Sequence, residues 1–145
     1  AFGMAGLRLG FAVGQKALVD AVKAGKSPYN VNSLSQRMGA LVLQHPQAMK
    51  EALQTLLASR DDLLSGIKAL AAEFPNRFEL LESATNFATL SIKDGEALFQ
   101  YLGQQGIAIR DTGGLVRITC GTPEENRAVL QEMAAYFAAT PAEGK

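Results

Sequence analysis

Residues 46–74 form the longest periodic stretch of this chain and constrain its fold more than any other feature. Its large apolar residues recur every three or four positions, as one face of an amphipathic helix requires. They are Met49, Leu53, Leu56, Leu57, Leu63, Leu64, Ile67 and Leu70. A helix of this length spans on the order of 40 Å, more than a compact domain of this size needs internally. We therefore expect a helix that bridges two domains or subunits, or two helices broken near Gly66.

From Pro75 onward, short strand patterns alternate with helical patterns. Strands are predicted in the segments FELLES, NFATLSI, IAIR and LVRIT, and helices from about Asp94 to Gly106 and from Thr122 to about Ala139. Thr122, Pro123 and Glu125 together are typical of a helix start, with a cap, a first-turn proline and a capping-box glutamate. The order β-β-α-β-β-α predicts a small α/β sandwich.

The first 45 residues begin with an alternating pattern. Leu7, Leu9, Phe11 and Val13 alternate with small residues and Arg8, which predicts a strand over residues 7–13. No pairing strand follows before the long helix. Because a lone strand cannot satisfy its own hydrogen bonds, we expect its partners to lie outside this chain.

Two further helices are predicted before the long one. Residues 15–25 have apolar positions on one side and end at Gly25. A turn-rich segment with Pro28 follows, and Ser33 with Gln36 then predicts a capping box for a helix that ends before His45.

Composition excludes several classes of protein. Hydrophobic residues make up 48% and charged residues 19% of the chain, so it can bury a core. Its 14 basic and 14 acidic residues balance, which argues against binding to nucleic acids or anionic membranes. One cysteine, Cys120, excludes an internal disulfide and favours a reducing, cytoplasmic compartment.

The hairpin around Gly113 offers the sharpest candidate site. With a loop of two or four residues, Arg110 lies opposite Leu115, and Ala108 opposite Arg117. Arg110 and Arg117 are then diagonal neighbours on one face. The other face carries the core residues Ile107, Ile109, Val116 and Ile118. Two like charges on one face repel unless an anion lies between them, so the pair indicates a carboxylate or phosphate site or, equally simply, two solvated side chains.

Other candidate site residues have weaker support from the sequence. His45 has no metal-ligand partner at a suitable spacing, and Cys120 is expected to be a packed thiol. Tyr29 and Asn30 lie in a loop where polar groups could face a ligand, although turn structure explains them as well. The residues alone therefore indicate anion binding without a complete catalytic apparatus.

Five segments resemble a known family in the right order. They are AFGMAGLRLGFAVG, PYNVNSLSQ, ATNFATLSI, GIAIRDTGG and LVRITCGTPEENRAVL. They are similar to the C-terminal part of histidinol-phosphate aminotransferases, a branch of the pyridoxal-phosphate-dependent, fold-type-I (class I/II) aminotransferases. The resemblance extends to about Phe137.

The resemblance implies roles for individual residues. In this family the lysine that holds pyridoxal phosphate as a Schiff base would lie just before Ala1. Arg8 would bind the cofactor phosphate, while Arg110 and Arg117 would bind substrate anions, Arg117 the α-carboxylate. Tyr29 and Asn30 would line the same pocket.

The resemblance also implies a domain organisation. Residues 1–45 would be a remnant of the cofactor-binding large domain, 46–74 an interdomain helix, 75–140 the small C-terminal α/β domain and 141–145 a tail. The missing N-terminal segment would be a partner, together with a second copy in a homodimer. Since the lysine and most of the large domain are missing, we expect the chain alone to bind no cofactor and to be inactive.

The implied activity of the intact protein is amino transfer between glutamate and an imidazole-acetol-phosphate-like keto acceptor, in histidine biosynthesis. A related possibility is a threonine-phosphate decarboxylase. A possibility from another class is a binding or oligomerisation module without catalytic activity.

Overall fold

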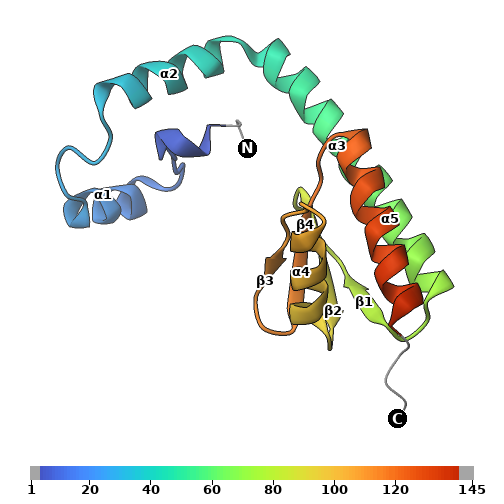
Figure 1. Cartoon of the computed structure of the whole chain (residues 1–145). Coiled ribbons are helices and arrows are strands. Elements are labelled where there is room, and N and C mark those ends of the chain that lie inside the picture. The colour runs from blue at the N-terminus through green and yellow to red at the C-terminus, as the bar shows by residue number, and fades with distance from the viewer. Residues whose placement is uncertain (1–3, 141–145) are drawn as a thin grey trace. The chain divides into compact units, whose positions relative to one another are not determined.

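The computed structural model describes residues 4–140 (Figure 1). The chain divides into two compact units, Ala1–Ala52 and Leu53–Lys145. The first unit contains η1 (Ala5–Leu7), α1 (Lys16–Gly25), α2 (Ser33–Gln44) and the beginning of α3 (Pro46–Glu73). The second contains the rest of α3 and then β1 (Phe78–Leu81), β2 (Phe87–Ile92), α4 (Gly95–Gln104), β3 (Arg110–Asp111), β4 (Leu115–Thr119) and α5 (Pro123–Ala139).

The second unit is a two-layer α/β sandwich. Its four-stranded antiparallel sheet has the order β1-β2-β4-β3. One face of the sheet buries alternate residues against the helices. Fully or nearly fully buried residues come from α3 (Leu63, Ile67), β2 (Leu90), α4 (Leu98, Leu102), β4 (Val116, Ile118) and α5 (Met133, Phe137). The helices thus occupy one face and leave the other for a site.

Most predicted elements of the second unit are confirmed. The strands in FELLES, NFATLSI and LVRIT and the two helices lie where the patterns place them. The capping box of α5 forms both bonds: the Glu125 amide donates to Thr122 Oγ1 (3.2 Å), and the Thr122 amide donates to Glu125 Oε2 (2.7 Å). In the IAIR segment, only Arg110 belongs to a strand. Ile107 instead donates its amide to Leu102 O at the end of α4 (2.8 Å), so it cannot join the ladder there.

Helix α3 is continuous, and the predicted alternative of a break near Gly66 is wrong. Close packing against α5 explains why a glycine occupies position 66. A Cβ atom at Gly66 would lie 2.3 Å from Leu130 Cδ1 of α5, so the missing side chain lets the two helices approach closely.

The predicted strand over residues 7–13 is wrong. The chain forms the short 3-10 helix η1 and then an irregular segment up to Gln15. Arg8 ends η1 with a left-handed backbone (φ 51°). The described residues provide no ladder for this segment, and without one the alternating pattern cannot form a strand. Its apolar side chains are exposed, Phe11 by 73% and Val13 by 92%.

The start of α2 also differs from the prediction. Asn32, not Ser33, is the N-cap, and its Oδ1 accepts from the Ser35 amide (2.8 Å). Asn32 has the extended backbone of a cap and stands three residues before that amide, which its short side chain reaches. The Gln36 side chain donates to Val31 O (2.9 Å) rather than forming the predicted capping box. The predicted helix over residues 15–25 is confirmed as α1, and the predicted tail, 141–145, lies outside the described residues.

Candidate functional site

A two-residue turn sets the register of the β3–β4 hairpin. Gly113 and Gly114 both have positive φ (75° and 92°), as a tight type I′-like connection requires. The Thr112 amide donates to Leu115 O (2.9 Å), which closes the turn. The Asp111 carboxylate accepts from the Gly113 amide (2.9 Å) and fixes its first residue. The turn therefore lies on the two glycines, where positive φ costs little.

Arg110 lies directly opposite Arg117 in this register. The prediction that the two arginines are diagonal neighbours is wrong, because the turn is centred one residue later than the predicted pairing needs. That change moves the pairing by two residues, so both side chains still belong to the same face of the sheet. The predicted core face is confirmed: Val116 and Ile118 are buried, and Ile107 and Ile109 pack against the core.

The face of the sheet that lacks helices carries these arginines and is called the open sheet face here. Its residues alternate with the buried ones along β1, β2, β3 and β4. They are Glu79, Leu81, Phe87, Thr89, Ser91, Arg110, Leu115, Arg117 and Thr119. Thr89 lies opposite Arg117.

Arg117 is held by an aromatic ring. Its guanidinium carbon lies 4.0 Å from the centroid of the Phe87 ring, within the range of a cation–π interaction. Its Nε atom is buried and has no hydrogen-bond partner within residues 4–140. Neither Arg117 nor the exposed Arg110 forms an ion pair with any residue between 4 and 140. Two uncompensated positive charges therefore stand opposite each other.

A buried polar network fixes the end of β4. Asn126, which is 4% exposed, donates through Nδ2 to Ser59 O (3.0 Å) and Ser59 Oγ (2.9 Å). Its Oδ1 accepts from the Gly121 amide (2.9 Å), and Ser59 Oγ donates to Gly121 O. The loop that follows Arg117 is thus tied to α3. The one sequence signal for Asn126 is its position on the apolar stripe of α5, three residues before Val129, and no site was predicted there.

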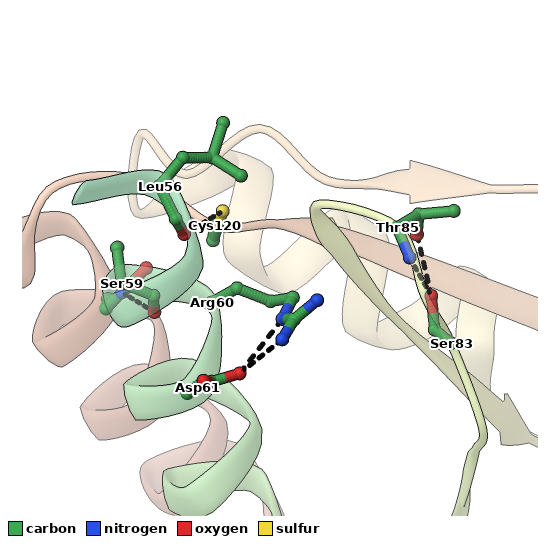
Figure 2. A network of polar contacts seen from close by, with 8 residues as sticks. Leu56, Ser59, Arg60, Asp61, Ser83, Thr85 and Cys120 are labelled. Atoms are coloured by element: carbon green, nitrogen blue, oxygen red, sulfur yellow. Dashed lines mark hydrogen bonds and ion pairs between the residues drawn. The ribbon is translucent and has the colours of Figure 1, made fainter. Parts of the chain in front are cut away.

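Cys120 and Arg60 lie beside this network (Figure 2). The Cys120 thiol is partly buried, with Sγ 4.0 Å from Leu56 O, and burial raises its pKa, so it is a protonated thiol at neutral pH. Arg60 binds the Asp61 carboxylate through Nη2 (2.7 Å) and Nε (3.0 Å). Because burial raises the pKa of Cys120, the thiolate that a reaction would need is disfavoured.

The other predicted site residues belong to the first unit. Arg8 is exposed, and η1 is tied to α2 by a hydrogen bond from Ser35 Oγ to Leu7 O (3.0 Å). Tyr29 is 97% exposed with a left-handed backbone (φ 64°), and Asn30 is exposed beside it. No hydrogen bond or ion pair within residues 4–140 joins the side chains of Arg8, Tyr29 and Asn30. The structure thus brings together Arg110 and Arg117 but provides no link among these three.

The described part of the chain contains no group of three or more His, Cys, Asp or Glu side chains that could hold a metal ion. His45 caps the end of α2 and is exposed. Among the described helices, none has both the length and the apolar character to cross a bilayer.

Comparison with known proteins identifies relatives over nearly the whole chain. Residues 1–133 match the family described as aminotransferase class I and II. A histidinol-phosphate aminotransferase of Streptomyces avermitilis is 34% identical over 133 residues, which are 90% of this chain and 34% of the relative. One from Thermobifida fusca is 36% identical over 128 residues, 86% of this chain and 33% of the relative. The chain therefore spans about a third of the length of these relatives.

Solved structures agree with this match. L-threonine-O-3-phosphate decarboxylase from Porphyromonas gingivalis superimposes with a TM-score of 0.77 at 26% identity, covering 94% of this chain and 44% of that one. Histidinol-phosphate aminotransferase from Clostridium acetobutylicum gives a TM-score of 0.71 at 17% identity, covering 86% and 39%. The second likeness concerns the fold alone.

Proposed function

Because this chain belongs to the class I and II aminotransferase family, we propose that it is the C-terminal part of a cytoplasmic, homodimeric histidinol-phosphate aminotransferase. The intact enzyme would exchange an amino group between glutamate and a phosphorylated keto acceptor. Relatives that bear this name, at 34% and 36% identity over most of the chain, support the choice within the family.

The proposal rests on Arg110 and Arg117, which lie opposite each other on neighbouring strands and form no ion pair within residues 4–140. Arg117, held by Phe87, would bind the α-carboxylate of the substrate through its terminal nitrogens. Arg110, directly opposite, would bind the second anion, which is the distal carboxylate of glutamate or the phosphate of the other substrate. Two cations on one face of the sheet would thus suit both partners of the exchange.

The family is pyridoxal-phosphate dependent, and the cofactor supplies the electron sink for the amino transfer. Arg8 fits the role of its phosphate ligand, because its side chain is exposed and has no ion-pair partner among residues 4–140. Tyr29 and Asn30 would line the same pocket. The lysine that the chemistry needs is expected upstream of Ala1, so this chain alone would hold no cofactor and would be inactive.

The remaining polypeptide would be the partner of the first unit. The exposed apolar side chains of the first unit support this proposal, because large exposed apolar surfaces are typical of sites that contact another polypeptide. They include Phe11 (73%), Val13 (92%), Leu18 (67%), Val22 (64%) and Leu34 (67%).

Two assays test the proposal. First, the chain mixed with pyridoxal phosphate and glutamate should release no 2-oxoglutarate, and release would contradict the proposed inactivity. Second, the longer polypeptide that contains this segment should convert histidinol phosphate and 2-oxoglutarate into the corresponding phosphorylated ketone and glutamate. Substitution of Arg117 by Gln in that polypeptide should raise KM for glutamate strongly, and an unchanged KM would contradict the assigned role.

A second candidate is a threonine-phosphate decarboxylase. The decarboxylase from Porphyromonas gingivalis superimposes with the higher TM-score of the two structures compared above, 0.77 against 0.71. The same polypeptide incubated with L-threonine O-3-phosphate would then release carbon dioxide. Release of carbon dioxide without amino transfer would favour this candidate.

A further inference from the structure

We propose that Phe87 is a positioning residue, whose ring holds the Arg117 guanidinium while leaving its hydrogen-bond donors free for an incoming carboxylate. The inference rests on the proposed function, since it assigns to Phe87 the task of presenting the arginine that binds substrate.

The register of the sheet places the ring beside the arginine. Thr89 is opposite Arg117 and Phe87 is opposite Thr119, so Phe87 and Arg117 are diagonal neighbours on the open sheet face. Diagonal neighbours are within reach of aromatic and long side chains. The guanidinium carbon lies 4.0 Å from the ring centroid, within the range of a cation–π interaction.

Three other arginines of the second unit have a carboxylate partner, which Arg117 lacks. Arg60, Arg77 and Arg127 each bind a carboxylate, on Asp61, Asp94 and Glu124, with nitrogen–oxygen distances of 2.7, 2.9 and 3.0 Å. A carboxylate partner neutralises the guanidinium and uses N–H donors along its edge. A cation–π contact with an aromatic ring places no carboxylate on these donors. Phe87 therefore orders Arg117 without occupying the atoms that a ligand needs.

The burial of Nε indicates which edge of the Arg117 guanidinium remains free to bind a ligand. Nε of Arg117 is shielded and lacks a hydrogen-bond partner among the described residues, whereas Nη1 and Nη2 are not shielded in this way. The free edge is therefore the one formed by the two terminal nitrogens, which matches the two oxygens of a carboxylate. The closeness of Arg110 on the opposing strand adds positive charge at that edge.

Phe87 is dispensable for the core, which makes the inference testable. It is not a member of the buried cluster, and its neighbours Ala88 and Leu90 fill the core face of β2. Replacement by Leu should therefore remove the ring without removing a core residue. Phe99 on α4 provides a matched control, since it is 36% exposed and belongs to the helical layer.

The experiment uses the 145-residue chain and 2-oxoglutarate as the probe. NMR spectra follow both the binding of the dianion and the Nε–H resonance of Arg117, which the ring current of Phe87 shifts. Phe87→Leu should weaken binding about two- to fivefold, as expected for losing a cation–π contact at an accessible site. It should also remove the ring-current shift. Phe87→Tyr should retain both, and Phe99→Leu should change neither.

The variants distinguish the proposed binding role of Arg117 from the proposed positioning role of Phe87. If Arg117→Gln leaves 2-oxoglutarate binding unchanged, or the parent chain does not bind it, the assigned function of Arg117 fails. If Arg117→Gln abolishes binding but Phe87→Leu binds as the parent chain does, Arg117 keeps its function and the positioning role of Phe87 is overturned. An Nε–H resonance without a ring-current shift in the parent chain would overturn that role by itself, whether or not the probe binds.

Discussion

Asn126 should contribute more to the stability of the second unit than any of its surface polar residues. It is 4% exposed and its side chain makes three hydrogen bonds, two to Ser59 and one from the Gly121 amide, all between 2.9 and 3.0 Å. At about 1 kcal/mol for each intramolecular hydrogen bond, Asn126→Ala should lower the free energy of unfolding by about 3 kcal/mol. The Gly121 N–H, left without its Asn126 acceptor, would increase that loss.

Urea unfolding followed by circular dichroism measures the loss, with Asn86→Ala as the matched control. Asn86 is exposed, and the bond that it accepts from the Cys120 amide uses its backbone oxygen, so the control should change stability by less than about 0.5 kcal/mol. Hydrogen exchange at the Gly121 amide provides a local measurement and should accelerate in Asn126→Ala. A loss below about 1 kcal/mol, with unchanged exchange at Gly121, would refute the idea that this network holds the loop after β4.

Other substitutions test separate features of the second unit. Burial, followed by the hydrogen bond that Tyr136 donates to Asp94 (2.8 Å), raises the pKa of Tyr136 from 10.0 to about 12. Because the unfolded chain ionises first, stability present below pH 10 should fall by up to about 3 kcal/mol as the pH rises to 12, and urea midpoints for Tyr136→Phe should lose this dependence. Thr122→Ala removes the bond to the Glu125 amide and should cost about 1 kcal/mol in urea unfolding. Gly114→Ala must adopt a φ of 92°, and should lower the unfolding free energy by at least about 1 kcal/mol; an unchanged midpoint would contradict the need for glycine there.

Periodicity alone predicted the sandwich of the second unit because each of its elements finds its partner within the chain. β2 alternates buried and half-buried residues along its whole length, and α3 buries Leu63, Ile67 and Leu70 at helical spacing. The same reasoning failed for residues 7–13, where the alternating pattern is present but no strand within the described residues pairs with it. A strand depends on its neighbours in a way that a helix does not.

The pairing of Arg110 with Arg117 on one face was predictable by residue type and alternation, but their register was not. The segment IAIRDTGGLVRIT offers a turn centred on Thr112–Gly113 and one centred on Gly113–Gly114, and only the second gives positive φ to two glycines. Preference for glycine at both positions would have selected the observed pairing. The contact between Phe87 and Arg117 could not have been predicted from either strand alone, since it depends on how β2 and β4 are aligned.

Two arginines of the second unit, Arg77 and Arg117, have different surroundings. The Arg77 side chain is 7% exposed; it binds Asp94 (2.9 Å) and lies 5.0 Å from the ring centroid of Phe137. A carboxylate and a ring together neutralise and enclose that charge, so Arg77 stabilises the end of α5 and offers nothing to a ligand. Arg117 has the ring without the carboxylate. The missing carboxylate is what a substrate would supply, and the arginine is ordered before that substrate arrives.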